Sequence, residues 1–181
     1  MENYFKLLDI EQATKIDLET LSDHHKKLAA EHHPDHPDNN ADDSRYRLIN
    51  TAYETLKSPS KRLAHLMELE GIHYEKRGTV SDHLMDLFMS TAQTLQDTDA
   101  FLRKKSTTTS ALAMALLEGE SQQFQELIST QIDSIEVEKS STLEKASLKE
   151  ELAKLLGNAA RDLAFLEKWQ AQLKERYARL F

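Results

Sequence analysis

Apolar residues recur at every third or fourth position along most of the chain, which is the spacing of one buried face of an α-helix. The first long helix is predicted after Asp17, because aspartate favours the N-terminal cap, and Pro34 and Pro37 end it. A single helical turn is predicted before it, at residues 3–8. The buried face of the long helix is predicted to consist of Leu18, Leu21, His25, Leu28 and His32.

Two further helices are predicted before residue 72. One begins at Asp43 or Ser44, after a segment whose Pro, Asn and Asp content is typical of a loop. The other begins at Ser58-Pro59, and Gly71 is a natural terminator for it. The inward face of the first of these helices is predicted from Tyr46, Ile49, Asn50, Tyr53 and Leu56.

Longer helices are predicted in the rest of the chain. One runs from Ser81 or Asp82 to about residue 105, and a second from Ala111 to about residue 139, with a possible break near Gly119. Two capping-box sequences precede the last helix, so the sequence does not decide at which of them the helix starts. Its near-heptad seam is typical of antiparallel helices packed at a shallow angle. The seam consists of Leu152, Leu155, Ala159, Leu166, Leu173, Tyr177 and Leu180.

These patterns predict an all-α protein: a helical hairpin with two short helices, followed by a C-terminal three-helix bundle. The expected domains are residues 1–72 and residues 81–181, joined by a linker at 73–80. The chain has only 4 glycines and 3 prolines, so few strands and tight turns are expected.

Composition excludes several classes of function. The chain has no cysteine, so it cannot form a disulfide or a thiolate metal site. Its net charge of −8 disfavours binding to nucleic acid or to an anionic membrane. No apolar run approaches the ~20 residues that span a bilayer, and the N-terminus lacks the pattern of a secretory signal. A cytoplasmic location is therefore expected.

A set of motifs occurs in fixed order within residues 3–70, and on these motifs the segment resembles a J-domain. The resemblance implies a helical hairpin with His33-Pro34-Asp35 at its tip, and a DnaK-type chaperone partner whose ATP hydrolysis this loop stimulates. Glu31 and Ser22 depart from the family, since many J-domains carry basic residues there. The matching motifs are Tyr4-Phe5, Leu7-Leu8, Lys26-Lys27-Leu28-Ala29, His33-Pro34-Asp35, Asn50, Ala52-Tyr53, Leu56, Pro59 and Arg62.

The chemistry of the tripeptide agrees with a docking role. Pro34 restricts the backbone, so less conformational entropy is lost when a partner binds. Asp35 supplies an acceptor suited to an arginine of the partner, and His33 can donate and accept in one ring. Lys26 and Lys27 add positive charge to an acidic protein and favour approach to an acidic surface. By itself, the tripeptide would merely end a helix.

The histidines leave a second interpretation open. Five of them lie close together in sequence with Asp35 and Asp38 nearby, a composition that could hold a metal in a hydrolase. Adjacent helical residues point about 100° apart, so His24 and His25 cannot share a face. We expect no metal and no cofactor. The five are His24, His25, His32, His33 and His36.

The whole chain resembles HscB-type iron–sulfur co-chaperones. The resemblance is carried by the segment from Pro59 to Gly71, by the Phe165-Leu166-Glu167-Lys168 run and by the final Leu180-Phe181. It implies a C-terminal bundle that holds the scaffold on which an iron–sulfur cluster is built. The implied contact residues are Leu84, Met85, Phe88 and Phe165.

Helical spacing points to the same region. Met85 and Met89 lie off the main apolar stripe of their helix, and Phe165 and Trp169 lie off the seam of theirs, which leaves surplus apolar surface. Packing on neighbouring helices is the alternative explanation. The uncharged run Ser90-Thr91 departs from the family, where acidic and basic residues follow.

We therefore expect a non-enzymatic co-chaperone of a DnaK/HscA-type chaperone that delivers an iron–sulfur scaffold client. The alternatives are a J-domain co-chaperone whose bundle binds another client or self-associates, and a metal-dependent hydrolase. Neither a phosphate-binding glycine loop nor a convincing pair of catalytic acids is present.

Overall fold

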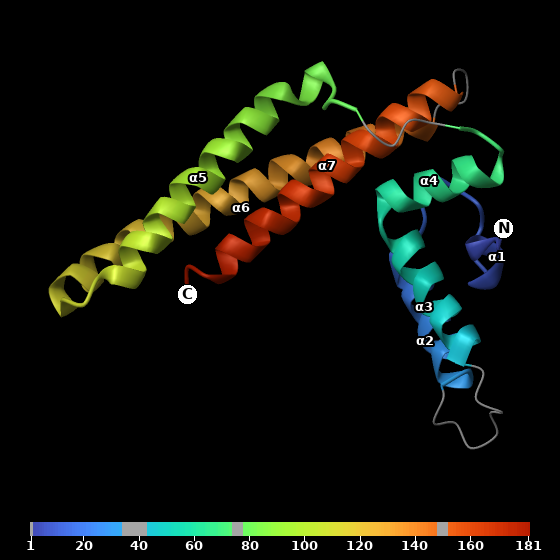
Figure 1. Cartoon of the computed structure of the whole chain (residues 1–181), viewed down its shortest axis with the longest axis horizontal. Helices are drawn as coiled ribbons and strands as arrows, with labels where there is room; N and C mark the ends of the chain where they lie inside the picture. Colours follow the sequence, from blue (N-terminus) through green and yellow to red (C-terminus); the bar gives the residue numbers. More distant parts are fainter. Residues whose placement is uncertain (1, 34–42, 74–77, 148–151) are drawn as a thin grey trace. The chain divides into compact units, whose positions relative to one another are not determined.

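The computed structural model describes residues 2–33, 43–73, 78–147 and 152–181, with no side chain described at 43, 147 and 152–155. All regular structure within these ranges is helical, which confirms the predicted all-α class (Figure 1). The chain divides into two compact units. The first contains residues 1–78 and 143–164, and the second contains residues 79–142 and 165–181. The predicted domain boundaries at 72 and 81 stay predictions.

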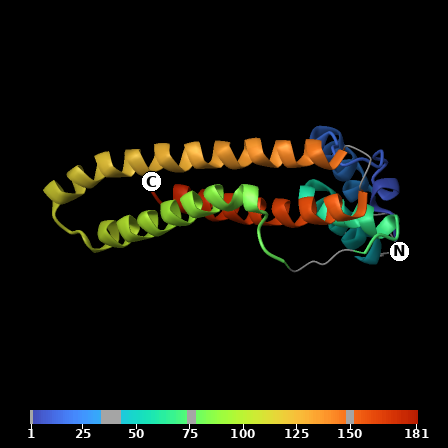
Figure 2. The same ribbon diagram turned by 90° about the horizontal axis from the view of Figure 1, so that it is seen from above.

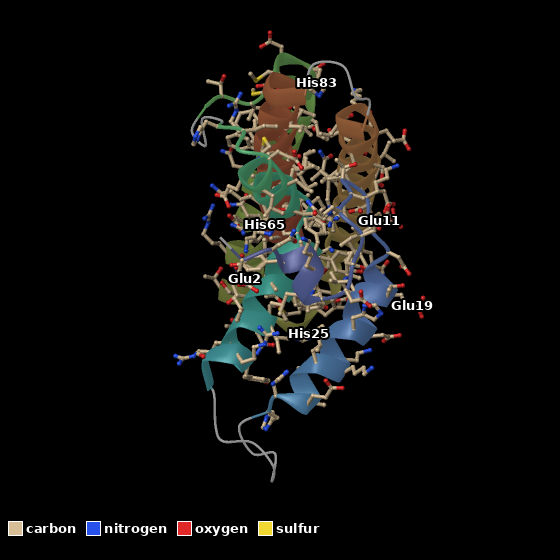
Figure 3. The ribbon with its side chains drawn as sticks, turned by 90° about the vertical axis from the view of Figure 1, so that its right-hand side faces the viewer. Glu2, Glu11, Glu19, His25, His65 and His83 are labelled. Atoms are coloured by element: carbon tan, nitrogen blue, oxygen red, sulfur yellow. The ribbon has the colours of Figure 1, made fainter. Side chains whose placement is uncertain are left out.

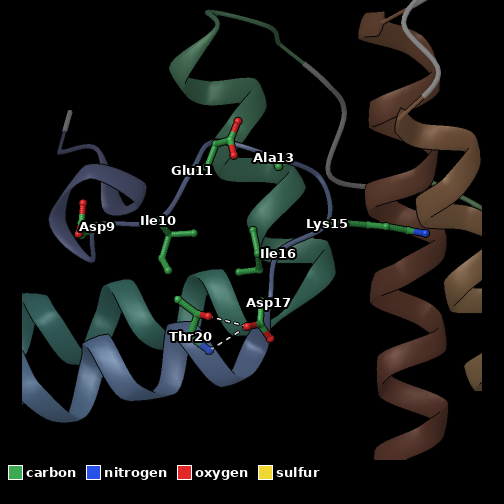
Figure 4. A pocket seen from close by; sticks show the side chains of 8 residues that line it. All are labelled: Asp9, Ile10, Glu11, Ala13, Lys15, Ile16, Asp17 and Thr20. Carbon is green, nitrogen blue, oxygen red and sulfur yellow. Dashed lines mark hydrogen bonds between the residues drawn. The ribbon is translucent and has the colours of Figure 1, made fainter.

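The first three helices of the first unit begin where local chemistry predicts. α1 spans Tyr4–Leu7, α2 spans Leu18–Glu31 and α3 spans Asp43–Lys57. The Asp17 carboxylate caps α2 by accepting from the backbone N–H of Glu19 at 3.1 Å and of Thr20 at 3.3 Å. Figure 4 shows the contacts between Asp17 and Thr20. These hydrogen bonds satisfy amides that have no partner inside the helix.

α2 and α3 lie side by side as a hairpin, with α1 against α3 (Figure 1). Their facing stripes form one core, because the three-to-four spacing places most apolar residues of each helix on one side. Leu18, which was predicted in the buried face of α2, is 53% exposed, so that part of the prediction was wrong. α1 covers this core with an aromatic side chain. The fully buried members are Phe5, Leu8, Leu21, Ile49, Ala52 and Leu56.

α4 spans Pro59–Leu69 and begins as predicted, with the Ser58 hydroxyl accepting from the Lys61 N–H. Gly71 ends the segment at φ +69°, a left-handed conformation that favours glycine. α4 also packs on the residues from 143 to 164 that belong to this unit, which the helical pattern did not indicate. This second core consists of Leu63, Met67, Ala146, Leu156, Ala159, Ala160 and Leu163.

The second unit is a bundle of three helices, seen from above in Figure 2. A single 3₁₀ turn at Asp82–Leu84 leads into α5 at Met85–Thr107, followed by α6 at Ala111–Ser147 and α7 at Leu152–Ala178. α6 and α7 contribute residues to both units. The core of this unit contains Leu84, Phe101, Leu102, Leu117, Ile128, Ile135, Leu166, Trp169, Leu173 and Leu180.

Two predictions about α6 were wrong. The helix continues past residue 139 to Ser147, and Gly119 lies inside it without a break. Buried Thr142 and Ala146 extend the inner face beyond the predicted end, so packing outweighs the weak helix preference of the Ser140-Ser141-Thr142 run.

Within the described ranges, no helix is both long and apolar enough to cross a membrane.

Candidate functional site

The structure places His33 at the end of the α2–α3 hairpin, two residues after α2 ends. Its side chain is exposed, and its ring meets the Tyr46 ring of α3 edge-on, with 5.3 Å between centroids and 75° between planes. An edge-to-face aromatic contact restricts the ring without covering it. Pro34 and Asp35 lie outside the described residues, so their predicted role is untested.

Lys26 and Lys27 are both exposed on α2. The Lys26 ammonium lies 3.2 Å from an Asp23 carboxylate oxygen, a surface ion pair one helical turn away. Exposed pairs of this kind contribute about 0–1 kcal/mol, so Lys26 can leave Asp23 for a partner at little cost. Both ammonium groups belong to α2, and His33 follows the C-terminal end of this helix.

A polar and aromatic cluster joins α2 to α3 midway along the hairpin. His25 bonds the Asn50 side-chain oxygen at 2.8 Å, and its ring stacks on Tyr53 with centroids 4.1 Å apart (Figure 3). The Lys57 ammonium lies over the Tyr53 ring, 5.3 Å from its centroid. These contacts fix the register of the two helices and so hold the tip. Helical spacing predicted the inward side of these residues but not their pairing.

Buried Arg62 ties three segments of the first unit together. Its guanidinium donates to the backbone carbonyl of Thr14 at 3.0 Å and to that of Leu56 at 2.5 Å. Arg62 is only 3% exposed, so both carbonyls depend on it. The residue belongs to the matching motifs, but its sequence position did not reveal which groups it bonds.

His65, labelled in Figure 3, is buried beside α1. Its Nε2 accepts the backbone N–H of Tyr4 at 3.1 Å, and its ring stacks on Tyr4 and Phe5 with centroids 4.4 and 5.9 Å apart. Burial lowers the pKa of His65, and the nearby Glu68 carboxylate offsets part of this effect. The neutral ring is therefore the form that holds α1 in place.

The predicted client-contact residues of the second unit differ in exposure. Met85 is 43% exposed and Phe88 37%, whereas Leu84 is 1% exposed and lies in the core. Phe165 of α7 is partly buried against the same core. Met89 is 61% exposed and adjoins the first two on α5. Met85, Phe88 and Met89 thus present their side chains to solvent, whereas Leu84 packs in the core.

Trp169 connects the two helices that carry these residues. Its ring centroid lies 5.5 Å from that of Phe88 on α5 and 6.1 Å from that of Phe165 on α7. Trp169 itself is 5% exposed, so it belongs to the core. The structure therefore brings Phe88 and Phe165 into contact with the same indole ring.

Ser90 and Thr91 have partners within the bundle. The Gln131 amide nitrogen of α6 donates to the Ser90 hydroxyl at 2.9 Å and to the Thr91 hydroxyl at 2.8 Å. Thr91 is buried and Ser90 is exposed. The uncharged run after Met89 thus joins α5 to α6.

Among the described residues, no group of three His, Asp or Glu side chains could hold a metal ion. His24 bonds the Leu8 carbonyl at 2.9 Å and His25 bonds Asn50, so their ring nitrogens have separate partners. Asp35, His36 and Asp38 lie outside the described ranges, so the metal hypothesis is tested only for the remaining residues.

A hollow of about 250 Å³ is lined by the segment that joins α1 to α2 and by the first turn of α2 (Figure 4). Asp9, Glu11 and Asp17 contribute carboxylates to its lining, but Asp17 already caps α2. Hydrogen bonds from the Thr20 hydroxyl and from the α2 amides lower the pKa of Asp17, which therefore stays ionised. The Lys15 side chain points away from the hollow, and its ammonium lies 3.1 Å from a carboxylate oxygen of Glu144. The hollow thus assembles no acid, base and nucleophile in contact.

The DnaJ domain family matches residues 3–65. A Neisseria meningitidis protein named co-chaperone protein HscB homolog is 40% identical over 78 residues, 40% of this chain and 47% of the relative. A Shewanella pealeana protein of the same name is 31% identical over 83 residues, 42% and 48% of the two chains. The chaperone protein DnaJ of Mycoplasmopsis pulmonis is 36% identical over 61 residues, 34% of this chain and 16% of the relative.

The alignments to the curated HscB relatives span about half of their length, 47–48%. The solved structure of chaperone HscB from Vibrio cholerae aligns with 99% of this chain and 100% of its own, with a TM-score of 0.68 and 20% identity. At that identity, the structural match supports the shared fold, including the bundle beyond the J-domain. The Neisseria and Shewanella relatives are named as co-chaperones.

Proposed function

We propose that this chain is an HscB-type J-domain co-chaperone that stimulates ATP hydrolysis by a heat-shock protein 70 class chaperone, as its similarity to the DnaJ domain family and to HscB proteins supports. The observation that carries the proposal is the exposed His33 at the end of the hairpin, followed in sequence by Pro34-Asp35. The His25 cluster holds the two helices behind it.

In this proposal the chain performs no covalent chemistry of its own. Lys26 and Lys27 attract an acidic surface of the chaperone, and the hairpin then offers His33 and Asp35 as hydrogen-bonding groups. Because the Tyr46 ring already restricts His33, little side-chain entropy is lost on docking. Hydrolysis takes place in the chaperone, whose bound nucleotide is the substrate.

The His33→Gln variant tests this proposal. We expect it to lose the stimulation of single-turnover ATP hydrolysis by a DnaK/HscA-type chaperone, with an unchanged thermal melting curve. His73→Gln is the matched control, because His73 is also exposed but lies outside the hairpin. Full stimulation by His33→Gln would refute the assignment.

We further infer that the bundle presents an iron–sulfur scaffold protein to the chaperone through Met85, Phe88, Met89 and Phe165. Support comes from the exposure of the first three, since methionine and aromatic side chains on a surface are typical of protein-binding patches. The ring contacts of Phe88 and Phe165 with the buried Trp169 support a preformed patch that need not rearrange on binding.

Calorimetry with a purified iron–sulfur scaffold protein tests the client. We expect Met85→Ala and Phe165→Ala each to weaken binding at least tenfold. Met114→Ala is the control, because Met114 is 42% exposed, against 43% for Met85. If the native chain binds no scaffold but His33 still controls chaperone stimulation, the bundle serves another client or self-association.

A further inference from the structure

An outer stripe on α6 lies outside both proposed sites. Its residues follow spacings of four, three, four, four and three, so they share one side of the helix over about five turns. All are exposed, and Leu112 and Leu116 are 75% and 69% exposed. The outer stripe consists of Leu112, Leu116, Gly119, Gln123, Leu127 and Thr130.

The inner face of the same helix already has its partners. Leu117, Ile128 and Ile135 are at most 3% exposed and pack in the bundle core. α6 is therefore uncharged along two opposite sides. A surface helix normally carries charge on the side that faces solvent, so a second uncharged side is typical of a helix with a further neighbour. In Figure 2 this part of α6 runs along one side of α5 and α7.

A hollow of about 570 Å³ adjoins the outer stripe. Gln123 and Leu127 of the stripe line it, and beside them lie Phe101 and Phe124, whose ring centroids are 4.8 Å apart. Its volume leaves ample room for a large apolar side chain from a partner, and its two aromatic rings offer that side chain an apolar contact. Lys104 and Glu120 close one side through two contacts of 2.9 Å.

Gly119 lies in the middle of the stripe. A methyl group placed there would have no atom within 4 Å, so no packing within the described residues requires glycine. Glycine inside a helix is unfavourable, but it lets another backbone approach closely. The position therefore suits a helix that crosses α6 between Leu116 and Gln123.

The charges that border the stripe select the partner. From residue 111 to residue 138, α6 contains glutamate and aspartate but no lysine or arginine. Glu120 borders the stripe on one side, and exposed Glu126 and Asp133 border it on the other. The nearest cation, Lys104, is paired with Glu120. A second α6 would bring like charges together, and an anionic membrane would be repelled.

From the stripe, the hollow and these borders, we propose that the outer stripe of α6 binds a basic amphipathic helix of a partner protein. The apolar side of that helix covers Leu112, Leu116 and Leu127, and one large side chain enters the hollow. Lysine and arginine residues on its flanks face the acidic borders. This surface would be a third binding site, separate from His33 and from the Met85 patch.

A labelled cysteine provides the readout, because the native chain has none. Gln123→Cys, carrying an environment-sensitive dye, is titrated with a synthetic three-heptad helical peptide that has leucine on one side and lysine or arginine on its flanks. We expect a blue shift of the dye emission, weakened by salt. The same peptide with glutamate on its flanks should bind at least tenfold more weakly.

Charge substitutions locate the binding surface. Leu116→Glu with Leu127→Glu should abolish the shift, and Leu112→Glu alone should weaken it if the double variant does not fold. Met114→Glu is the control, because Met114 lies on the opposite side of α6 and should keep the shift. The proposal is overturned by equal binding of both peptides, by unaltered binding to the Leu variants, or by sedimentation that shows self-association through the stripe.

Discussion

The edge of the His33 ring faces the Tyr46 ring across the end of the α2–α3 hairpin, with 5.3 Å between their centroids. His33 is exposed and Tyr46 is half-buried, so the tyrosine orients the histidine without hiding it. Such aromatic pairs contribute about 0.5–1.5 kcal/mol. Tyr46 of α3 thus holds the His33 ring in place for the proposed chaperone contact.

Tyr46→Ala should reduce stimulation of the chaperone about 2- to 10-fold, which is the rate equivalent of losing that aromatic contact. Tyr46→Phe keeps the ring and should retain nearly full stimulation. Single-turnover ATP hydrolysis at subsaturating concentrations of the variants provides the measurement. Equal losses in both variants would point to the hydroxyl group and contradict orientation by the ring.

Arg62→Met should destabilise the first unit by about 2–4 kcal/mol, because the buried Leu56 carbonyl and the half-buried Thr14 carbonyl both lose a charged donor. Urea unfolding followed by circular dichroism measures the effect. Arg103→Met serves as the control, since Arg103 is exposed on α5 and should change stability by less than about 0.5 kcal/mol. Similar unfolding midpoints for the two variants would contradict the role of Arg62.

Stability should fall as the solution is acidified from pH 7.5 to pH 5. Burial lowers the pKa of His65 in the folded state, so the unfolded chain binds the proton more readily. The contribution of His65 to folding stability is complete above the ordinary histidine pKa of 6.5, and it is lost as pH falls toward the lower pKa of the folded state. The slope from one such group is at most about 1.4 kcal/mol per pH unit.

His65→Phe keeps an aromatic ring beside Tyr4 and Phe5 but does not titrate. Urea unfolding at several pH values should therefore give a smaller loss of stability on acidification than the native chain shows. An identical pH dependence in the two proteins would mean that other groups cause it.

Gly119→Ala should stabilise the free protein by about 1 kcal/mol, because alanine favours the helix and its methyl group would meet no atom within 4 Å. Thermal unfolding measures this gain. The same variant should bind the basic helical peptide more weakly, since the added methyl group separates the two backbones. Higher stability together with unchanged peptide binding would indicate that close approach at Gly119 is not needed.

Local chemistry made much of the fold predictable. The caps at Asp17 and Ser58, the left-handed Gly71 and the start of α3 depend on residues a few positions apart, so they could be identified from the chain alone. The end of α6 could not, because buried Thr142 and Ala146 extend the helix through packing with distant residues.

The sites divide in the same way. Short motifs indicated His33, Lys26 and Lys27. The family resemblance implied Met85 and Phe88, and Met85 also lies off the apolar stripe of its helix. The order of residues did not show that Leu84 is buried in the core, that Trp169 contacts both Phe88 and Phe165, or that Tyr46 orients His33. Each of these depends on which side chain of another helix lies opposite.

By itself, the sequence determined the helical class and most helix starts, because capping, helical periodicity and proline act within a few residues, and it predicted the docking tripeptide. Tertiary structure alone decided that α4 packs on residues 143–164, and which apolar residues on α5, α6 and α7 are buried or exposed. Periodicity defines the side of a helix that avoids water, but the contacts that cover that side come from residues far away in the chain.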